Sequence, residues 1–320
     1  MCSSDLGDLS AGDFVATLSY LEMLIWPMLG AGFTVNMLQR GAASLARVNA
    51  VLNEEPEIQN PPEPVREMHS TSISIRNLSF TYEDDEGETP ALQDITLEIP
   101  EGSILGILGR TGSGKSTLLR LLPRMQNPPR GTVFVGGVDV LDYDLATLRS
   151  AFGTVPQDTY LFSTSLHDNI AFAVDDPDDA YIRHVAEVST ISRDMKMFPN
   201  GWETQVGERG ITLSGGQKQR VAISRALAKD PRILVFDDAL SAVDTETEEL
   251  ILNKLLTERA GRTSILVSHR VSTLATADRV AVLDRGRLAQ YGTHEELLQE
   301  EGFYREVALL QQLSQNKTST

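Results

Sequence analysis

Cysteine is almost absent from this sequence, whose 320 residues include only Cys2. A single cysteine excludes an internal disulfide framework and a metal site built from cysteines, and it is consistent with a reducing compartment. Positive charge is also scarce, because 28 lysines and arginines stand against 45 aspartates and glutamates, a formal net charge of −17. So acidic a chain opposes binding to nucleic acid or anionic lipid through a broad electrostatic field. We therefore expect no nucleic-acid partner, and we expect any anionic ligand to be held by local chemistry.

Charged residues are nearly missing from residues 14–38, where Glu22 is the only one. A helix of this length would span ~37 Å at ~1.5 Å per residue, which exceeds the ~30 Å hydrocarbon core of a bilayer. We therefore predict a transmembrane helix at about 14–38. The alternative is a buried helix of a soluble domain, because Pro27 and two glycines would interrupt the stretch. Residues 1–13 are polar and lack the basic start of a secretory signal.

The residues after the apolar run indicate its orientation and its end. Arg40 and Arg47 follow the run, which predicts that its C-terminal end faces the cytoplasm. A helical pattern continues to Leu52. Residues 53–70 begin with a proline-rich segment, and prolines at this density forbid a helix and favour an extended, semi-rigid connector. We predict a domain boundary in this linker.

Beyond the linker, apolar residues alternate with a period of two at 73–80 and 95–99, on either side of the acidic segment 83–88. A shorter hairpin pattern lies at 133–140. Alternation of this kind predicts strands that are buried on one face. We expect these segments to form a small antiparallel sheet.

Continuous apolar runs indicate a second kind of strand. They lie at 233–236, 264–267 and 280–283, with helical patterns between them. Such runs are typical of strands buried on both faces, so they predict a parallel sheet and an α/β fold class. The polar tail 314–320 is predicted to be disordered.

A glycine loop is the most informative stretch of the chain. It reads G-x-x-x-x-G-K-S and comprises Gly109, Arg110, Thr111, Gly112, Ser113, Gly114, Lys115, Ser116 and Thr117. Apolar runs flank it on both sides, which predicts the order strand, loop, helix. Backbone N–H groups of such a loop cradle phosphates, Lys115 would reach the outer phosphates, and the Ser116 hydroxyl would bind Mg²⁺. The alternative is a glycine-rich turn in an ordinary α/β protein.

Asp237 directly follows the apolar run 233–236. An acid at the end of a buried strand can hold Mg²⁺, directly or through water, across from a phosphate loop. The pattern alone is common, but beside a phosphate loop it predicts a metal ligand.

A second glycine-containing helix start follows Leu213 and comprises Ser214, Gly215, Gly216 and Gln217. A serine and two glycines at a helix start can form an anion-binding N-terminus. One nucleotide does not need two such sites on one chain. We therefore expect this segment to bind ATP held by a different subunit. The alternative is a simple helix cap.

In this combination and order, the motifs resemble those of the nucleotide-binding domain of an ABC transporter, of the exporter type with fused membrane and ATPase domains. Residues 109–117 resemble the family's Walker A loop, 233–237 its Walker B strand and 213–217 its signature. The resemblance implies a P-loop NTPase core with a parallel sheet, an antiparallel β subdomain and an α-helical signature subdomain. It implies ATP and Mg²⁺ as cofactors.

The resemblance also assigns roles to other positions. Tyr82 matches the aromatic residue that stacks on adenine, and Gln157 matches the glutamine that touches Mg²⁺ and senses the membrane domain. Asp244 lies in the segment 241–244, which resembles the D-loop that crosses to the partner. His269 matches the switch histidine near the γ-phosphate. Residues 204–210 resemble the segment that communicates with the coupling helices.

Residues 1–52 resemble the last spanning helix of the transmembrane domain and its cytoplasmic extension, and 71–313 the ABC nucleotide-binding domain. The preceding helices are missing, so the chain looks like a fragment and predicts no particular cargo. The resemblance implies a cell-membrane location, with the nucleotide-binding domain on the cytoplasmic side. It implies pairing with a second half-transporter, which can be the same or a different chain.

One position departs from the family pattern. A glutamate usually follows the Walker B aspartate, as the base that polarises the attacking water, and here Asp238 takes its place. The shorter side chain withdraws the carboxylate by ~1 Å or more, and such a misplacement can cost ~10²-fold in rate. Asp238, His269 and Gln157 are nevertheless the expected catalytic residues. The change resembles the weak half of a heterodimer. The alternative is a homodimer in which the aspartate reaches the water after a small backbone adjustment.

Two other function classes stay open at this stage. The chain could be a soluble ABC-type ATPase of DNA repair or translation, although such proteins usually carry two cassettes or long coiled-coil insertions and neither pattern occurs here. It could also be a regulatory half that binds ATP with little hydrolysis of its own.

Overall fold

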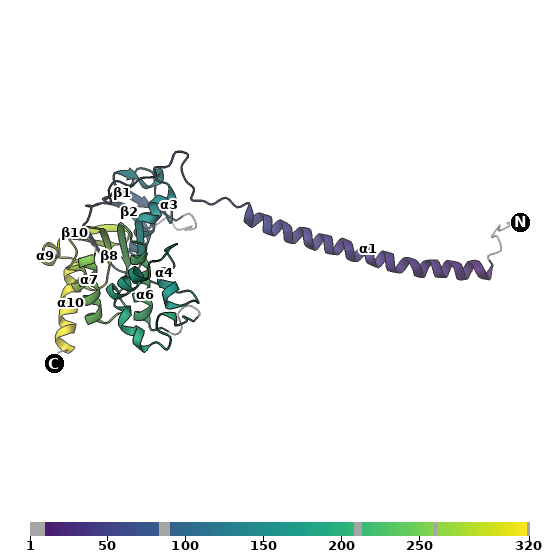
Figure 1. Ribbon diagram of the computed structural model, residues 1–320. Coiled ribbons are helices and arrows are strands. Elements are labelled where there is room, and N and C mark those ends of the chain that lie inside the picture. The colour runs from purple at the N-terminus through teal and green to yellow at the C-terminus, as the bar shows by residue number, and fades with distance from the viewer. Residues whose placement is uncertain (1–9, 83–89, 208–212, 259–260, 319–320) are drawn as a thin grey trace. The chain divides into compact units, whose positions relative to one another are not determined.

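The chain separates into two units in the computed structural model, which describes residues 10–82, 90–207, 213–258 and 261–318. Figure 1 labels several of their helices and strands. The division falls between Glu57 and Ile58, inside the predicted linker 53–70. Val65 already belongs to the second unit, since its N–H donates to Asp142 O at 2.8 Å.

The described part of the first unit is dominated by helix α1, Ala11–Leu52, of 42 residues. The helix begins with a capping box, in which Ser10 Oγ accepts from Asp13 N at 3.2 Å and the Asp13 carboxylate accepts from Ser10 N at 3.1 Å. Pro27 lies inside the helix without ending it. By length and composition α1 can cross a membrane, and none of its residues is buried within this chain. The predicted span 14–38 lies within it.

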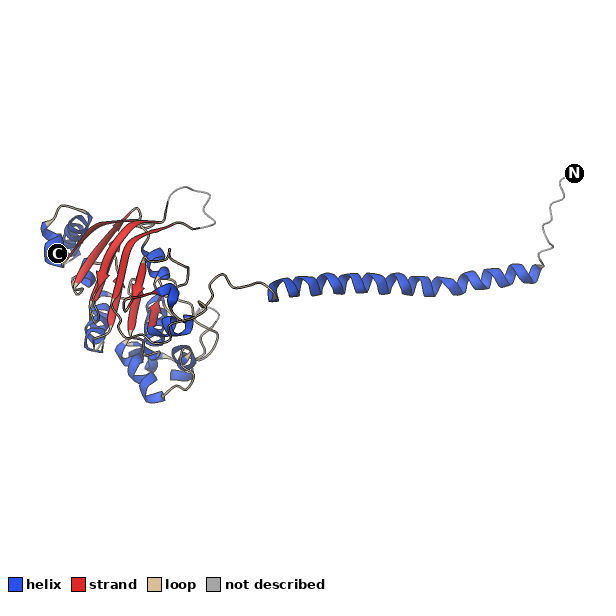
Figure 2. Cartoon of the chain, turned by 90° about the horizontal axis from the view of Figure 1, so that it is seen from above, coloured by secondary structure: helices blue, strands red, loops and turns tan. Residues whose placement is uncertain are grey.

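The second unit is built on a six-stranded sheet in the order β10-β9-β3-β8-β7-β6. Its strands are β3 Ile104–Gly109, β6 Phe152–Val155, β7 Ile233–Asp237, β8 Thr263–Val267, β9 Arg279–Asp284 and β10 Arg287–Gly292. All neighbours are parallel except β9 and β10. Every residue of β3 and β8 is buried, which explains their continuous apolar sequences. Figure 2 shows the strands side by side with helices around them.

The predicted parallel core is confirmed in β7, β8 and β9. Two strands lacked a sequence signal. β6 has only four residues and includes Gly153, while β10 is an edge strand with the polar sequence Arg-Leu-Ala-Gln-Tyr-Gly. Edge and short strands do not need the apolar run that marks a central strand.

A second sheet has four strands in the order β2-β1-β4-β5. The strands are β1 Ile73–Phe80, β2 Leu92–Ile99, β4 Val133–Val135 and β5 Val138–Asp139. All pairs are antiparallel, as predicted, and Ile73 pairs with Ile99 on one side and Val135 on the other. Buried side chains of β1 and β2 share a core cluster with α2, Lys115–Leu121. This sheet therefore supports the helix that follows the glycine loop. The acidic segment 83–88 lies outside the described residues.

The remaining described helices are η1 Val140–Asp142, α3 Leu145–Ala151, α4 Leu166–Ala171, α5 Asp179–Val188, η2 Ile191–Met197, η3 Gly201–Glu203, α6 Gly215–Ala228, α7 Thr245–Glu258, α8 Val271–Leu274, α9 His294–Gln299 and α10 Phe303–Thr318. Buried residues of α4, α5 and α6 share one core cluster, with Ile223 of α6 fully buried. This is the predicted helical subdomain. The predicted tail starts at Ser314, but α10 continues to Thr318.

Candidate nucleotide site

The glycine loop lies between β3 and α2, the order that the sequence predicts. Gly109 ends β3, and a Cβ there would lie 2.5 Å from both Leu283 O and Ser113 Oγ. Gly114 has φ 96°, and a Cβ there would lie 2.7 Å from Ala91 O. Neither position accepts a side chain without displacement of the backbone, so both require glycine. The close turn that results suits backbone N–H donation to a phosphate.

Lys115 folds back across this loop. Its ammonium donates to Gly109 O at 2.8 Å and to Arg110 O at 2.9 Å. Burial lowers the pKa of Lys115, and the nearby carboxylates of Asp237 and Asp238 oppose that shift. A phosphate oxygen is a stronger acceptor than a neutral carbonyl. The lysine is therefore placed to exchange its loop carbonyls for phosphate oxygens.

Ser116 and Asp237 meet across the site, where Ser116 Oγ donates to Asp237 Oδ2 at 3.0 Å. Burial raises the pKa of the Asp237 carboxyl, while the Ser116 hydrogen bond and the Lys115 charge oppose the shift. One hydroxyl and one carboxylate are donors that suit Mg²⁺, which commonly completes its coordination with substrate phosphates and water. The described residues contain no cluster of three or more His, Cys, Asp or Glu that could hold a metal alone. The donor set therefore fits Mg²⁺ delivered with a nucleotide.

Tyr82 lies beside the start of α2. Its hydroxyl is 3.0 Å from Thr117 Oγ1, and its ring packs edge-on against Phe80 with centroids 5.2 Å apart. The tyrosine ring is thus adjacent to the phosphate loop, on a half-buried surface. Its stacking on adenine stays a prediction.

Gln157 lies at the same end of the sheet as Asp237. Strands β6 and β7 are parallel, with Val155 opposite Phe236, so the residues that follow both strands emerge at one edge. Gln157 is exposed there. The topology therefore brings the predicted glutamine and aspartate to neighbouring strand ends.

Asp238 follows β7 with an unusual backbone, φ 50°. Its N–H donates to Val267 O at 3.1 Å, and its carbonyl accepts from Ser241 Oγ at 2.8 Å and from Ser241 N at 3.3 Å. The backbone is therefore fixed on both sides of the side chain.

His269 follows β8 and is exposed. It lines the same hollow as Asp238, together with Ser268 and Arg270. The two strand ends thus place the predicted base and the predicted switch histidine at one depression in the surface.

The signature segment begins α6. Ser214 caps the helix, because Ser214 Oγ accepts from Gln217 N at 3.2 Å and Gln217 Oε1 accepts from Ser214 N at 2.9 Å. A Cβ on Gly216 would lie 2.9 Å from Ala242 O, and one on Gly215 would lie 3.3 Å from Ala242 Cβ. The glycines therefore let the signature pack closely on the predicted D-loop.

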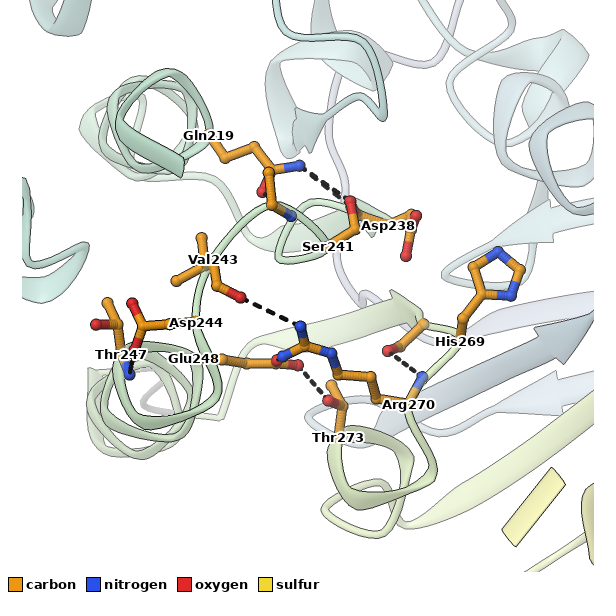
Figure 3. Close-up of polar contacts among 12 residues, drawn as sticks. Gln219, Asp238, Ser241, Val243, Asp244, Thr247, Glu248, His269, Arg270 and Thr273 are labelled. Atoms are coloured by element: carbon orange, nitrogen blue, oxygen red, sulfur yellow. Dashed lines mark hydrogen bonds and ion pairs between the residues drawn. The ribbon is translucent and has the colours of Figure 1, made fainter. Parts of the chain in front are cut away.

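Gln219, one turn further along α6, strengthens this contact, and sequence reasoning missed it. Its Nε2 donates to Ser241 Oγ at 3.2 Å, and its Oε1 accepts from Ala242 N at 3.0 Å. The side chain is only 5% exposed. Asp244 then caps α7, because its carboxylate accepts from Thr247 N at 2.9 Å, which lowers the pKa of the Asp244 carboxyl. Figure 3 shows this chain of contacts.

Arg270 links the D-loop to the switch histidine, which sequence reasoning also missed. Its guanidinium forms an ion pair with Glu248 of α7 and donates to Val243 O at 3.2 Å. Thr273 Oγ1 donates to the other Glu248 oxygen. Glu248 is 3% exposed, but no local pattern separates it from the exposed acids Glu246 and Glu249 of the same helix. Figure 3 shows Arg270 between Val243 and Glu248, next to His269.

The predicted communication segment 204–210 is described only in part. Val206 N donates to Thr164 O at 2.8 Å, and Leu166 N donates to Thr204 O at 3.1 Å, so these residues lie along the start of α4. Glu208, Arg209 and Gly210 lie outside the described residues.

Comparison with known proteins identifies the fold family. Residues 92–241 match the family model described as ABC transporter. The chain contains an ABC transporter domain. Domains of this family belong to ATP-hydrolysing transporter ATPases, so the matched domain of this chain is a nucleotide-binding domain.

The relatives of this chain include proteins named as ABC transporters, one of them as an exporter. A "Probable multidrug resistance ABC transporter ATP-binding/permease protein YheI" of Bacillus subtilis is 41% identical over 96% of this chain and 52% of the relative. An "ATM1-type heavy metal exporter" of Novosphingobium aromaticivorans is 38% identical over 94% of this chain and 49% of the relative. The chain thus spans about half the length of the curated relatives it matches.

A solved structure, "Structure of a bacterial Atm1-family ABC exporter with ATP bound", has a TM-score of 0.85 and 37% identity. The match covers 96% of this chain and 54% of that structure's chain. The predicted fold class is confirmed: an ABC-type P-loop domain with a long apolar helix before it.

Proposed function

We propose that this chain binds ATP together with Mg²⁺ and, as one of two facing nucleotide-binding domains, couples ATP hydrolysis to export across a membrane. The observation that carries the proposal is the 3.0 Å hydrogen bond between Ser116 and Asp237, beside the Lys115 ammonium. A cation, a carboxylate and a hydroxyl converge there at the end of a glycine loop. A magnesium–triphosphate complex has the charges and oxygens that these groups complement.

Each group has a proposed role toward the nucleotide. Lys115 and the N–H groups of the glycine loop bind the phosphates, and Tyr82 stacks on the adenine. Ser116, Asp237 and Gln157 hold Mg²⁺, whose charge, when it is bound, offsets that of the transferred phosphoryl group. The proximity of Ser116 to Asp237 and the shared sheet edge of Asp237 and Gln157 support this assignment.

The signature is proposed to serve the facing subunit. Ser214 and Gly215 are exposed at the start of α6, and Gly216 packs on Ala242 of the D-loop. This packing supports a single surface, made of residues 214–217 and Asp244, that closes over the triphosphate of the second domain. The helix start supplies a partial positive charge and N–H donors.

Hydrolysis in this site is proposed to be slow. Catalysis by positioning and charge stabilisation needs a carboxylate at the attacking water, with His269 and Gln157 at the γ-phosphate. Asp238 is short for this role, and its anchored backbone opposes the adjustment that would bring it forward. We therefore propose a heterodimer in which the signature of this chain completes the more active site on its partner.

The location proposed is a cell membrane, with the nucleotide-binding unit on the cytoplasmic side. Helix α1 supports it by length and composition. A soluble ATPase has no evident use for an apolar helix of which no residue is buried within the chain.

Crosslinking tests the facing arrangement. The chain has only Cys2, so a Cys2→Ser background permits one new thiol, Ser214→Cys, opposite a cysteine in the partner's glycine loop. We expect crosslinks with Mg²⁺ and ATP. We expect none when Lys115→Ala is combined with the matching lysine-to-alanine change in the partner's glycine loop, or when the thiol is moved to Ser150→Cys, an exposed position of α3. Crosslinking between copies of this chain would show a homodimer. No crosslink with any partner in the presence of ATP would refute the arrangement.

The regulatory-half alternative is tested by a single-turnover assay of the assembled pair. If this chain's site turns over bound ATP, although slowly, the site is catalytic. Retention of unhydrolysed ATP through many turnovers of the partner site would instead assign a regulatory role.

A further inference from the structure

The C-terminal helix α10 contacts two segments of the nucleotide site. At its start, the ring of Phe303 lies under the Arg110 guanidinium, 4.9 Å from the ring centroid. Two turns later, Gln311 Nε2 donates to His269 O at 2.6 Å, and Gln311 Oε1 accepts from Val271 N at 2.9 Å. Residues 303, 307 and 311 are spaced by four and therefore share one helix face. One rigid element thus touches both the glycine loop and the switch histidine.

Beside this contact face, α10 is firmly packed. Tyr304 is 0% exposed and Ala308 is 3% exposed, and both share a cluster with Leu108 of β3 and Val271 of α8. Strand β3 leads into the glycine loop and α8 follows the switch histidine. The Gln311 amide is therefore held at a fixed place against residues 268–270, the switch loop that contains His269.

The His269 imidazole depends on its backbone for orientation. Among the described residues it has no side-chain hydrogen-bond partner, and it is exposed. Its neighbours are anchored: Ser268 N donates to Ile107 O at 3.3 Å, and Arg270 reaches Glu248 and Val243. Gln311 adds the contact to the His269 peptide itself.

The bond to Val271 is also not a local cap. Arg270 is the N-cap residue of α8 and makes no side-chain cap hydrogen bond. The acceptor for Val271 N comes instead from Gln311, 40 residues away in sequence. The Gln311 amide thus satisfies the Val271 N–H at the start of α8 and also fixes the His269 carbonyl. These two groups belong to the residues directly after and directly before Arg270.

We propose that Gln311 is a positioning residue for His269: its two hydrogen bonds set the direction of the imidazole toward the γ-phosphate, so the C-terminal helix governs the competence of the switch histidine. The inference rests on the proposed function, since it needs a nucleotide that is hydrolysed at this site.

The principal test compares Gln311→Ala with Gln312→Ala, a glutamine on the exposed side of the same helix. Both are measured in the full chain in its membrane assembly, with the partner's own site inactivated, so that kcat and KM report only hydrolysis at this chain's site. We expect Gln311→Ala to lower kcat for ATP about tenfold, less than the ~10²-fold of a full 1 Å misplacement because the Arg270 anchors stay. The KM for ATP should change less than about twofold, and Gln312→Ala should match the wild type. Amide exchange at Val271 should become faster in Gln311→Ala alone.

A double-mutant cycle separates positioning from mere stabilisation. In a His269→Ala background, Gln311→Ala should lower kcat no further, because the group it positions is gone. Gln311→Glu keeps the acceptor for Val271 N but loses the donor to His269 O. It should reproduce most of the kcat loss of Gln311→Ala, and it remains informative if the alanine variant fails to fold.

An additive loss in the His269→Ala background, or a Gln311→Ala turnover equal to that of Gln312→Ala, would overturn the inference while leaving the proposed function intact. Absence of ATP hydrolysis by the wild-type assembly would overturn the proposed function, and this inference with it.

Discussion

Replacement of Asp238 by glutamate is expected to raise ATP turnover. The extra methylene moves the carboxylate forward by ~1 Å or more, and recovery of a misplacement of this size is worth up to ~10²-fold in rate, or ~2.7 kcal/mol of barrier. The backbone cannot supply the same movement cheaply, because Asp238 N is bonded to Val267 O at 3.1 Å and Asp238 O to Ser241 Oγ at 2.8 Å. The side chain alone therefore decides the reach of the base.

A stability cost opposes this gain. Asp238 has φ 50°, a left-handed conformation that costs most residues roughly 1–2 kcal/mol and that aspartate adopts more readily than glutamate. The difference between the two residues is therefore at most about 1 kcal/mol of folding stability. Since this is smaller than the catalytic gain, Asp238→Glu should fold and turn over faster.

The assay is phosphate release at saturating MgATP by the assembled protein in which the partner's own site is inactivated, so that only this chain's site turns over. MgATP affinity is measured alongside. We expect kcat to rise between about tenfold and ~10²-fold, with affinity unchanged. Asp238→Asn is the matched control, which should bind MgATP and lose hydrolysis. If Asp238→Glu folds, binds MgATP and turns over at or below the wild-type rate, the reasoning about reach is refuted.

Further substitutions test the rest of the site. Burial raises the pKa of the Asp237 carboxyl, so this carboxyl binds a proton more readily in the folded chain than in the unfolded chain. Ionised Asp237 therefore destabilises the nucleotide-free fold, and the full cost is present once the pH exceeds the raised pKa. Asp237→Asn should then raise the melting temperature at neutral pH and give no gain below about pH 4, where the unfolded carboxyl is protonated too; a gain independent of pH would contradict this. Lys115→Ala should weaken ATP binding about tenfold or more in calorimetry, whereas Lys196→Ala, at an exposed position of η2, should not. Tyr82→Ala should lower ATP affinity about fivefold because stacking is lost, whereas Tyr82→Phe should not lower it. Equal losses of affinity in the two variants would assign the effect to the Tyr82 hydroxyl, which lies beside Thr117.

Much of the fold follows from local pattern. The glycine loop, the Asp237 strand and the Ser214 helix start are each encoded by adjacent residues, so their elements and order could be predicted. Strands β6 and β10 could not, because short or edge strands need no continuous apolar run. Helix α10 likewise runs past the predicted boundary at Ser314.

The contacts around the site were harder to predict than its motifs. Gln219, Glu248 and Gln311 act on residues 22, 22 and 40 positions away. Each is an ordinary polar residue on a helix, and nothing in the sequence distinguishes it from exposed neighbours such as Gln312. Only folding brings these side chains to the D-loop and the switch loop, so their importance is a property of packing.

The unbroken course of α1 has a mechanical consequence. If residues 14–38 lie in lipid, residues 39–52 continue the same rod for ~21 Å below the hydrocarbon. Because the helix is continuous, a rotation of one end about the helix axis is transmitted to the other end, as a translation is. Removing one residue from 39–52 would turn everything upstream by ~100° about the helix axis, and so would present a different side of the spanning segment to its neighbours without altering a single lipid-facing residue.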